Sequence, residues 1–155
     1  MTPRTLFSWL ARAEAVTWTL LLVGMALKYV THTTELGVRV FGLVHGVVFL
    51  AFVLVALVLR VDQRWQPRVT ALVLGAAVLP FATLWVERAV ESGRLAGGTW
   101  RLAPGGDAPR TASEHLVAAA LVRPAAALLL AATAVGVTTV ALLAIGPPQL
   151  PGRGA

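Results

Sequence analysis

Four ionisable side chains fall within or beside strongly apolar stretches of the 155-residue sequence: Glu14, Lys28, His45 and Glu87. An ionisable group at membrane depth costs at least about 2.5–3.5 kcal/mol, so each of them needs a functional or structural explanation. A carboxylate or an imidazole in such a place can bind a proton or a cation, which is the chemistry of ion-coupled transport. These four residues are therefore the candidate functional residues of the chain.

Glu14 is the most unusual of the four. On a helix it shares a face with Thr17 and Trp18, and a polar stripe of this kind should face protein or water rather than lipid. One interpretation is a proton or cation site at Glu14. The other is an ion pair between Glu14 and an arginine near the same surface, such as Arg64 or Arg68.

His45 stands between Gly42 and Gly46, whose spacing of four lets two helices approach closely and predicts a helix contact. His45 then either donates a hydrogen bond across that contact, relays a proton, or serves as an axial haem ligand. A second haem ligand is not evident, because His32 falls in a loop and His115 in a segment expected at the membrane interface. We therefore expect no cofactor and no metal.

Lys28, Arg39 and Glu87 are expected at one membrane surface, since they end the first, begin the second and end the third predicted span. The simplest interpretation is an ion-paired cluster that ties three helix ends together. Pro80 falls in the middle of the third span, where a proline removes one backbone hydrogen bond and kinks the helix. The freed carbonyl either coordinates a ligand or belongs to a packing kink.

Membrane-spanning helices are the elements that must position these residues. The sequence is 57% apolar and only 13% charged, with a mean hydropathy of +0.78, whereas soluble domains are about 25% charged. A bilayer core about 30 Å thick requires about 20 apolar residues per spanning helix. The predicted fold is an all-α, polytopic membrane helix bundle in a single domain. Its four transmembrane helices are expected at about residues 7–29, 38–59, 69–87 and 124–146.

A long loop, residues 88–123, precedes the fourth span. Within it, Thr111 and Glu114 form a capping-box pattern, which predicts a short interfacial helix before that span. Four spans place both termini on one side of the membrane. The positive charges are nearly balanced between the sides, but the compact loop 60–68 carries three arginines. We therefore expect cytoplasmic termini in the inner (plasma) membrane.

The order of these motifs resembles a family of small bacterial integral membrane proteins of unknown function. The family pattern has an early glutamate and a terminal Leu-Lys-Tyr in span one, Gly-x-x-His-Gly-x-x-Phe in span two and Pro-Phe-Gly-Thr in span three. Here these motifs read Glu14, Leu27-Lys28-Tyr29, Gly42 to Phe49 and Pro80-Phe81-Ala82-Thr83, within Leu10 to Arg88. Ala15 and Ala82 replace glycines of the pattern. The family usually has three spans, so the fourth lies outside the match.

The signatures of soluble enzymes are missing from the sequence. It contains no P-loop, no Gly-x-Ser-x-Gly and no His-Glu-x-x-His motif, so we expect no enzymatic activity, and a membrane enzyme or haem protein is only the third hypothesis. The arginines flank apolar runs and form no basic patch, which argues against nucleic-acid binding. Two functions are favoured for this protein of the lipid bilayer. One is a small transporter or permeation protein acting as a homo-oligomer, and the other is a structural or accessory subunit bound to another membrane protein.

Overall fold

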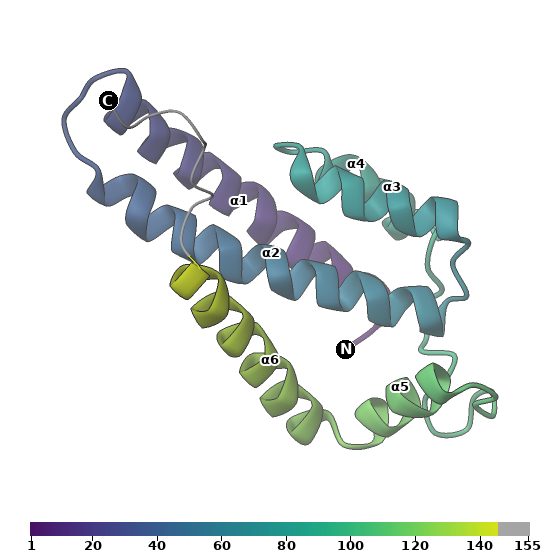
Figure 1. Ribbon diagram of the computed structural model, residues 1–155. Helices are drawn as coiled ribbons and strands as arrows, with labels where there is room; N and C mark the ends of the chain where they lie inside the picture. Colours follow the sequence, from purple (N-terminus) through teal and green to yellow (C-terminus); the bar gives the residue numbers. More distant parts are fainter. Residues whose placement is uncertain (146–155) are drawn as a thin grey trace.

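The computed structural model describes residues 1–145 as six α-helices joined by turns and one long loop (Figure 1). The helices are α1 Pro3–Tyr29, α2 Leu36–Asp62, α3 Pro67–Val78, α4 Thr83–Glu91, α5 Ala112–Val122 and α6 Pro124–Ile145. The predicted all-α class is confirmed. The expected end of the last span at residue 146 lies outside the described residues, as does Arg153, one of the positive residues counted for the expected cytoplasmic side.

The helices α1 and α2 form an antiparallel pair that runs the length of the molecule (Figure 1). Thr2 caps α1, because its hydroxyl accepts a hydrogen bond from the Thr5 backbone N–H at 3.2 Å. The backbones approach most closely where Gly24 faces Gly37. A Cβ atom added to Gly24 would lie only 2.7 Å from the carbonyl carbon of Gly37. Two glycines are therefore needed for this contact.

The third predicted span, residues 69–87, is not a single helix. The helix α3 ends at Val78 because Leu79, the residue before Pro80, is extended at φ −98° and ψ 128°. Phe81 then adopts a positive φ of 64°, and the chain reverses its direction. The helix α4 consequently returns beside α3 (Figure 1). We call residues 67–91 the helical hairpin.

Both ends of the helical hairpin lie at the N-terminal end of α1. The Trp65 indole N–H, just before α3, donates to the Leu95 carbonyl, just after α4. The hairpin tip is level with the middle of α1, where the Trp18 indole N–H donates to the Ala77 carbonyl at 3.3 Å. The 12 residues of α3 extend about 18 Å, well short of the roughly 30 Å of a bilayer core.

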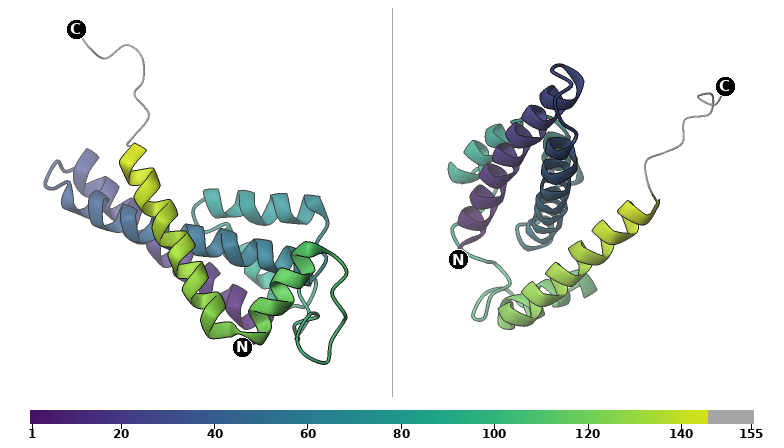
Figure 2. Two further views of the ribbon diagram at one scale, coloured as in Figure 1. Left: turned by 60° about the horizontal axis from the view of Figure 1, so that its bottom comes forward. Right: turned by 90° about the vertical axis from the view of Figure 1, so that its left-hand side faces the viewer.

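Three helices among residues 1–145 are long and apolar enough to cross a membrane, namely α1, α2 and α6. The prediction of four crossing helices is not confirmed, because the third predicted span is divided between α3 and α4. The helix α6 starts directly after α5, as expected for a short helix that leads into the last span. It buries no residue and stands away from the α1–α2 pair over much of its length (Figure 2).

The apolar core lies between the N-terminal half of α1, the C-terminal half of α2 and the helical hairpin. The Phe7 ring is its centre, 5.2 Å from the Phe52 ring and 6.4 Å from the Trp65 ring between centroids. Val73 of α3 and Val90 of α4 are fully buried against it. The hairpin is thus firmly packed on α1 and α2, and its tip forms one wall of the site described next.

Candidate functional site

The candidate functional site lies where α1, α2 and the tip of the helical hairpin meet. Glu14, near the middle of α1, is 0% exposed. The Thr83 hydroxyl, at the start of α4, lies 3.3 Å from Glu14 Oε2 and 3.4 Å from the Ala11 carbonyl oxygen. Glu14 Oε1 is buried and has no hydrogen-bond partner among the described residues. The carboxyl group is therefore enclosed but poorly satisfied.

Glu14 forms no ion pair within residues 1–145. Arg64, one of the two expected partners, instead lies 3.7 Å from both Asp107 and Glu114. An ionised carboxylate buried without a partner is unfavourable by several kcal/mol, so a proton or a cation must neutralise it. The ion-pair interpretation of Glu14 is therefore not supported by the structure. The other interpretation, a proton or cation site, stays a prediction.

His45 of α2 joins this site through Thr17. The Thr17 hydroxyl donates to the Glu14 backbone carbonyl at 3.0 Å and lies 3.1 Å from His45 Nδ1. A hydroxyl has only one proton, so when Thr17 donates it to the Glu14 carbonyl, His45 is the donor to Thr17 through Nδ1–H. The other ring nitrogen, Nε2, is then left as an acceptor. Trp18 packs against the imidazole, with ring centroids 4.5 Å apart, and its own N–H donates to the hairpin.

The glycines expected to form a close helix contact do not form it within the chain. A Cβ atom at Gly42 would meet the Leu21 side chain at an ordinary 3.8 Å, and one at Gly46 would meet nothing within 4 Å. The close contact is made by Gly24 and Gly37, which stand on either side of the short connection between the first two spans. A contact between chains through Gly42 and Gly46 stays a prediction.

The expected charged cluster forms without Glu87. Lys28 Nζ lies 3.3 Å from Glu35 Oε1, and Arg39 reaches Glu35 Oε2 at 3.4 Å, so the ends of α1 and α2 are tied together. Glu87 instead pairs with Arg12, at 2.6 Å from its Nε, near the N-terminal end of α1. The placement of Glu87 was wrong because the chain reverses after Pro80 and α4 runs back.

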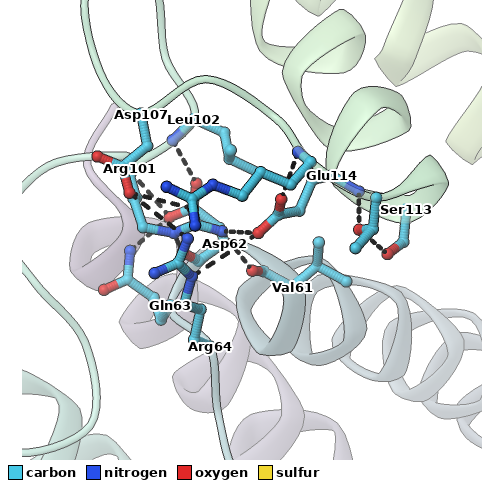
Figure 3. Close-up of polar contacts among 11 residues, drawn as sticks. Val61, Asp62, Gln63, Arg64, Arg101, Leu102, Asp107, Ser113 and Glu114 are labelled. Atoms are coloured by element: carbon cyan, nitrogen blue, oxygen red, sulfur yellow. Dashed lines mark hydrogen bonds and ion pairs between the residues drawn. The ribbon is translucent and has the colours of Figure 1, made fainter.

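A second polar cluster holds the long loop against the end of α2 (Figure 3). Asp62 is fully buried and accepts backbone hydrogen bonds from Arg101 at 3.2 Å and Leu102 at 3.0 Å. The Arg101 guanidinium donates to the Val61 carbonyl at 3.0 Å, which caps α2, and to Glu114 Oε1 at 2.6 Å. The loop and α5 are consequently anchored at the same end of the molecule as the N-terminus.

Glu114 lies in the first turn of α5, which begins after Thr111 as the capping-box pattern predicts. The Thr111 hydroxyl accepts a hydrogen bond from the Glu114 backbone N–H at 3.2 Å. The Arg110 backbone N–H and the Arg101 guanidinium lower the pKa of Glu114 to about 2, because both stabilise its ionised form. Every buried side-chain nitrogen and oxygen atom of this second cluster has a hydrogen-bond partner. The cluster therefore explains the position of the loop.

Thr83 is the site residue whose role the sequence analysis missed. Its position was recognised only as the last residue of the motif that begins at Pro80. The signal was present, because a hydroxyl residue that follows a proline break often satisfies freed polar groups inside a membrane. Its partner could not be inferred, since Glu14 is 69 positions away and meets it only through the reversal of the hairpin.

Comparisons with known proteins match the part of the chain that holds this site. A family model described as a domain of unknown function, DUF3817, covers residues 4–92, which include α1 to α4. A Streptomyces coelicolor protein named "Putative membrane protein SCO5905" is 45% identical over 94 residues. These residues are 57% of this chain but only 11% of that protein. No solved structure matches the chain.

Proposed function

Because the chain belongs to the DUF3817 family, to which no activity is assigned, we propose its function from the geometry: a small permeation or transport protein with an ion-binding carboxyl group at Glu14. The observation that carries this proposal is a carboxyl group with no exposed surface and no ion-pair partner in the described residues. Such a group takes up an ion to become neutral and releases it when its surroundings change. Binding and release at membrane depth are the elementary steps of ion-coupled transport.

His45 supports the same proposal. An imidazole ring can bind and release a proton, and Nε2 is the acceptor nitrogen when Nδ1 carries the proton. Thr17 links the two titratable residues, since its hydroxyl contacts both His45 Nδ1 and the Glu14 carbonyl. The proposed ion site therefore includes residues from α1, α2 and α4, and we propose no enzymatic step for it.

We propose that the transporting form is a homo-oligomer. Three long helices and a half-length hairpin are too few to enclose a pathway across a bilayer. The helix α6 buries no residue, and Gly46 faces open space on α2, so both offer surface for contacts between chains in the lipid.

Proton flux into proteoliposomes tests this function directly. The vesicles contain a pH-sensitive dye, and an imposed pH gradient drives the flux. Glu14→Gln keeps the size of the side chain but removes its charge, so we expect the flux above background to be lost. Glu35→Gln is the matched control, because it removes an ion-paired carboxylate at the far end of α1 and should leave the flux unchanged. Unchanged flux in folded Glu14→Gln protein would refute the proposal.

We further propose that the N-terminus faces the cytoplasm across the inner (plasma) membrane. Lys28 and Arg39 lie at the far end of the α1–α2 pair. The other positive residues described lie toward the N-terminal end of that pair or in segments anchored there. They are Arg4, Arg12, Arg60, Arg64, Arg68, Arg88, Arg94, Arg101, Arg110 and Arg123. Positive residues are retained inside, so ten arginines against two positive residues support this orientation.

This orientation revises the expectation that both termini share one side. With three crossing helices, the end of α6 at Ile145 lies opposite the N-terminus. Single cysteines in this cysteine-free chain test the arrangement with a membrane-impermeant thiol reagent. Arg94→Cys should react from the cytoplasmic side and Thr33→Cys from the other side. Reaction of both from the same side would refute the half-length hairpin.

The second candidate function is an accessory unit of a larger membrane complex. The observation that favours it is the Streptomyces coelicolor relative, in which the similar region is only 11% of a longer chain. The exposed Leu116 of α5, at the same end as the long loop, would then contact the partner. Leu116→Arg should abolish co-purification with another membrane protein while leaving the Arg101 contacts intact. A chain that purifies alone as a stable homo-oligomer would argue against this function.

A further inference from the structure

We propose that Glu14, Thr83 and the Ala11 carbonyl form a binding site for a monovalent cation the size of Na⁺. This inference rests on the proposed function at Glu14 and names the ion that the site takes. Three kinds of oxygen meet there: a carboxylate from α1, a hydroxyl from α4 and a backbone carbonyl from α1. These are the ligands that hard cations prefer in proteins.

The distances around Thr83 are unusual for hydrogen bonds. Its hydroxyl lies 3.3 Å from Glu14 Oε2 and 3.4 Å from the Ala11 carbonyl oxygen. Hydrogen bonds between oxygens are normally about 2.5–3.0 Å long. A threonine hydroxyl also has one proton and cannot donate fully to both acceptors while Glu14 is ionised. A protonated Glu14 would donate to Thr83 and leave the Thr83 proton for the Ala11 carbonyl, so hydrogen bonding explains the gathering of the three oxygens in the protonated state, whereas the ionised state calls for a cation.

The two distances from the Thr83 hydroxyl fit a cation that touches this hydroxyl together with Glu14 Oε2 and with the Ala11 carbonyl oxygen. A cation the size of Ca²⁺ or Na⁺ sits about 2.4 Å from its oxygen ligands, so that two ligands at right angles are roughly 3.4 Å apart. Mg²⁺, at about 2.0–2.1 Å from its ligands, would draw them to roughly 2.9 Å. The observed spacing therefore favours the larger ion.

The charge of the site selects a monovalent ion. Glu14 is its only carboxylate, and the described residues contain no group of three or more acidic or histidine side chains able to hold a metal ion. One carboxylate neutralises one positive charge, whereas a divalent ion would leave an uncompensated charge in the interior. Na⁺ combines the required size with the required charge.

The unpartnered Oε1 atom of Glu14 is an independent observation that points to a ligand. Its residue has no exposed surface, and this atom accepts no hydrogen bond from the described residues. A cation bound at the carboxylate would satisfy Oε1 together with Oε2. A proton would neutralise the same group, so Na⁺ and H⁺ compete for it, and the apparent affinity for Na⁺ falls as the pH is lowered.

Thermal unfolding of the purified full chain in nanodiscs tests this site. The Tm is measured at pH 8 while NaCl replaces choline chloride at constant ionic strength. We expect a saturable rise in Tm with Na⁺ and a smaller response to K⁺. Equal responses to Na⁺ and choline in the wild-type chain would overturn the inference without any variant. A larger response to Ca²⁺ than to Na⁺ would overturn the monovalent assignment.

Variants locate the bound ion. Thr83→Val removes the hydroxyl and should weaken Na⁺ binding at least tenfold, whereas Thr83→Ser keeps the hydroxyl and should retain it. Thr19→Val is the matched control, since the Thr19 hydroxyl contacts only its own helix at Ala15 and should not affect the Na⁺ response. Loss of binding in Thr19→Val, or full binding in Thr83→Val, would refute the assignment.

The two proposals fail in different ways. A Na⁺ response that disappears in Glu14→Gln, in a protein that carries neither H⁺ nor ²²Na⁺ into proteoliposomes, supports the site and refutes the transport function. Flux that depends on Glu14 without any Na⁺ response refutes the cation site and leaves the proton as the coupling ion.

Discussion

Replacing Gly24 by alanine tests the closest contact between α1 and α2. The new Cβ atom would lie 2.7 Å from the Gly37 carbonyl carbon and 2.9 Å from the Val38 nitrogen. Both are backbone atoms, so neither can rotate away as a side chain would. Carbon atoms in contact are normally about 3.5–4.0 Å apart, and the two helices must therefore separate by roughly 1 Å at this point.

The size of the effect follows from a comparison with Gly46→Ala. Both variants place alanine at a helical glycine, so both gain the same helix propensity of about 1 kcal/mol. Overpacking typically costs about 1–3 kcal/mol. It arises only at Gly24, because a Cβ atom at Gly46 would meet nothing within 4 Å. We expect the free energy of unfolding of Gly24→Ala to be about 1–3 kcal/mol below that of Gly46→Ala.

Reversible unfolding in mixed micelles measures this difference. The mole fraction of sodium dodecyl sulfate is increased while circular dichroism follows the helix content, and the wild-type chain and both variants are compared at the same protein concentration. If Gly46→Ala is the less stable variant, the important close contact lies at Gly46, between chains. Equal stability of the two variants would show that the Gly24–Gly37 approach has no energetic role. Either result refutes our explanation.

Two further predictions concern Glu114 in the second polar cluster and the contact between Thr17 and His45 in the candidate functional site. The pKa of Glu114 is about 2 in the folded chain and 4.5 ordinarily, so its stabilisation is complete above about pH 4.5 and is lost as the pH falls toward 2. Hydrogen-exchange protection factors of the long loop should therefore drop between pH 6 and pH 3. Arg101→Ala should lower them already at pH 6, whereas Arg110→Ala should not, because only the Arg110 backbone contacts Glu114. Thr17→Val removes the acceptor of His45 Nδ1, so ¹⁵N NMR of the ring should show less of the Nδ1-protonated tautomer; an unchanged ratio would contradict the assigned hydrogen bond.

The long helices could be predicted from the sequence because a membrane-crossing helix is defined by local properties. Predicted spans at 7–29, 38–59 and 124–146 correspond to α1 Pro3–Tyr29, α2 Leu36–Asp62 and α6 Pro124–Ile145. Length and apolar composition suffice for these helices.

The helical hairpin could not be predicted in the same way. Pro80 indicates that the helix is interrupted, but a kink and a reversal share this local signature. The reversal depends on the positive φ of Phe81 and on the distant pairing of α4 with α1 through Arg12 and Glu87. Everything inferred from a third crossing therefore changes in the proposed arrangement, including the membrane side of Glu87 and the side of the long loop.

The candidate site was predicted in part. Glu14 and His45 are identified by the contrast between an ionisable side chain and its apolar neighbours, which the sequence shows directly. The contacts of Glu14 with Thr83 and of His45 with Thr17 depend on how the helices pack. No spacing rule connects residues on different helices, so the ligands of the proposed cation site became visible only in the structure.

The reversal of the helical hairpin also bears on how the chain enters a membrane. Its turn, residues 79–82, carries no charge, and both of its ends remain at the N-terminal end of α1. The hairpin can therefore insert from one side without translocating a hydrophilic loop. In the proposed orientation, the connection 30–35 is the only polar link within residues 1–123 that must be translocated, and Glu35 is its only acidic or basic residue apart from His32. If α1 and α2 insert together as a pair, only the short polar connection between them has to pass through the lipid.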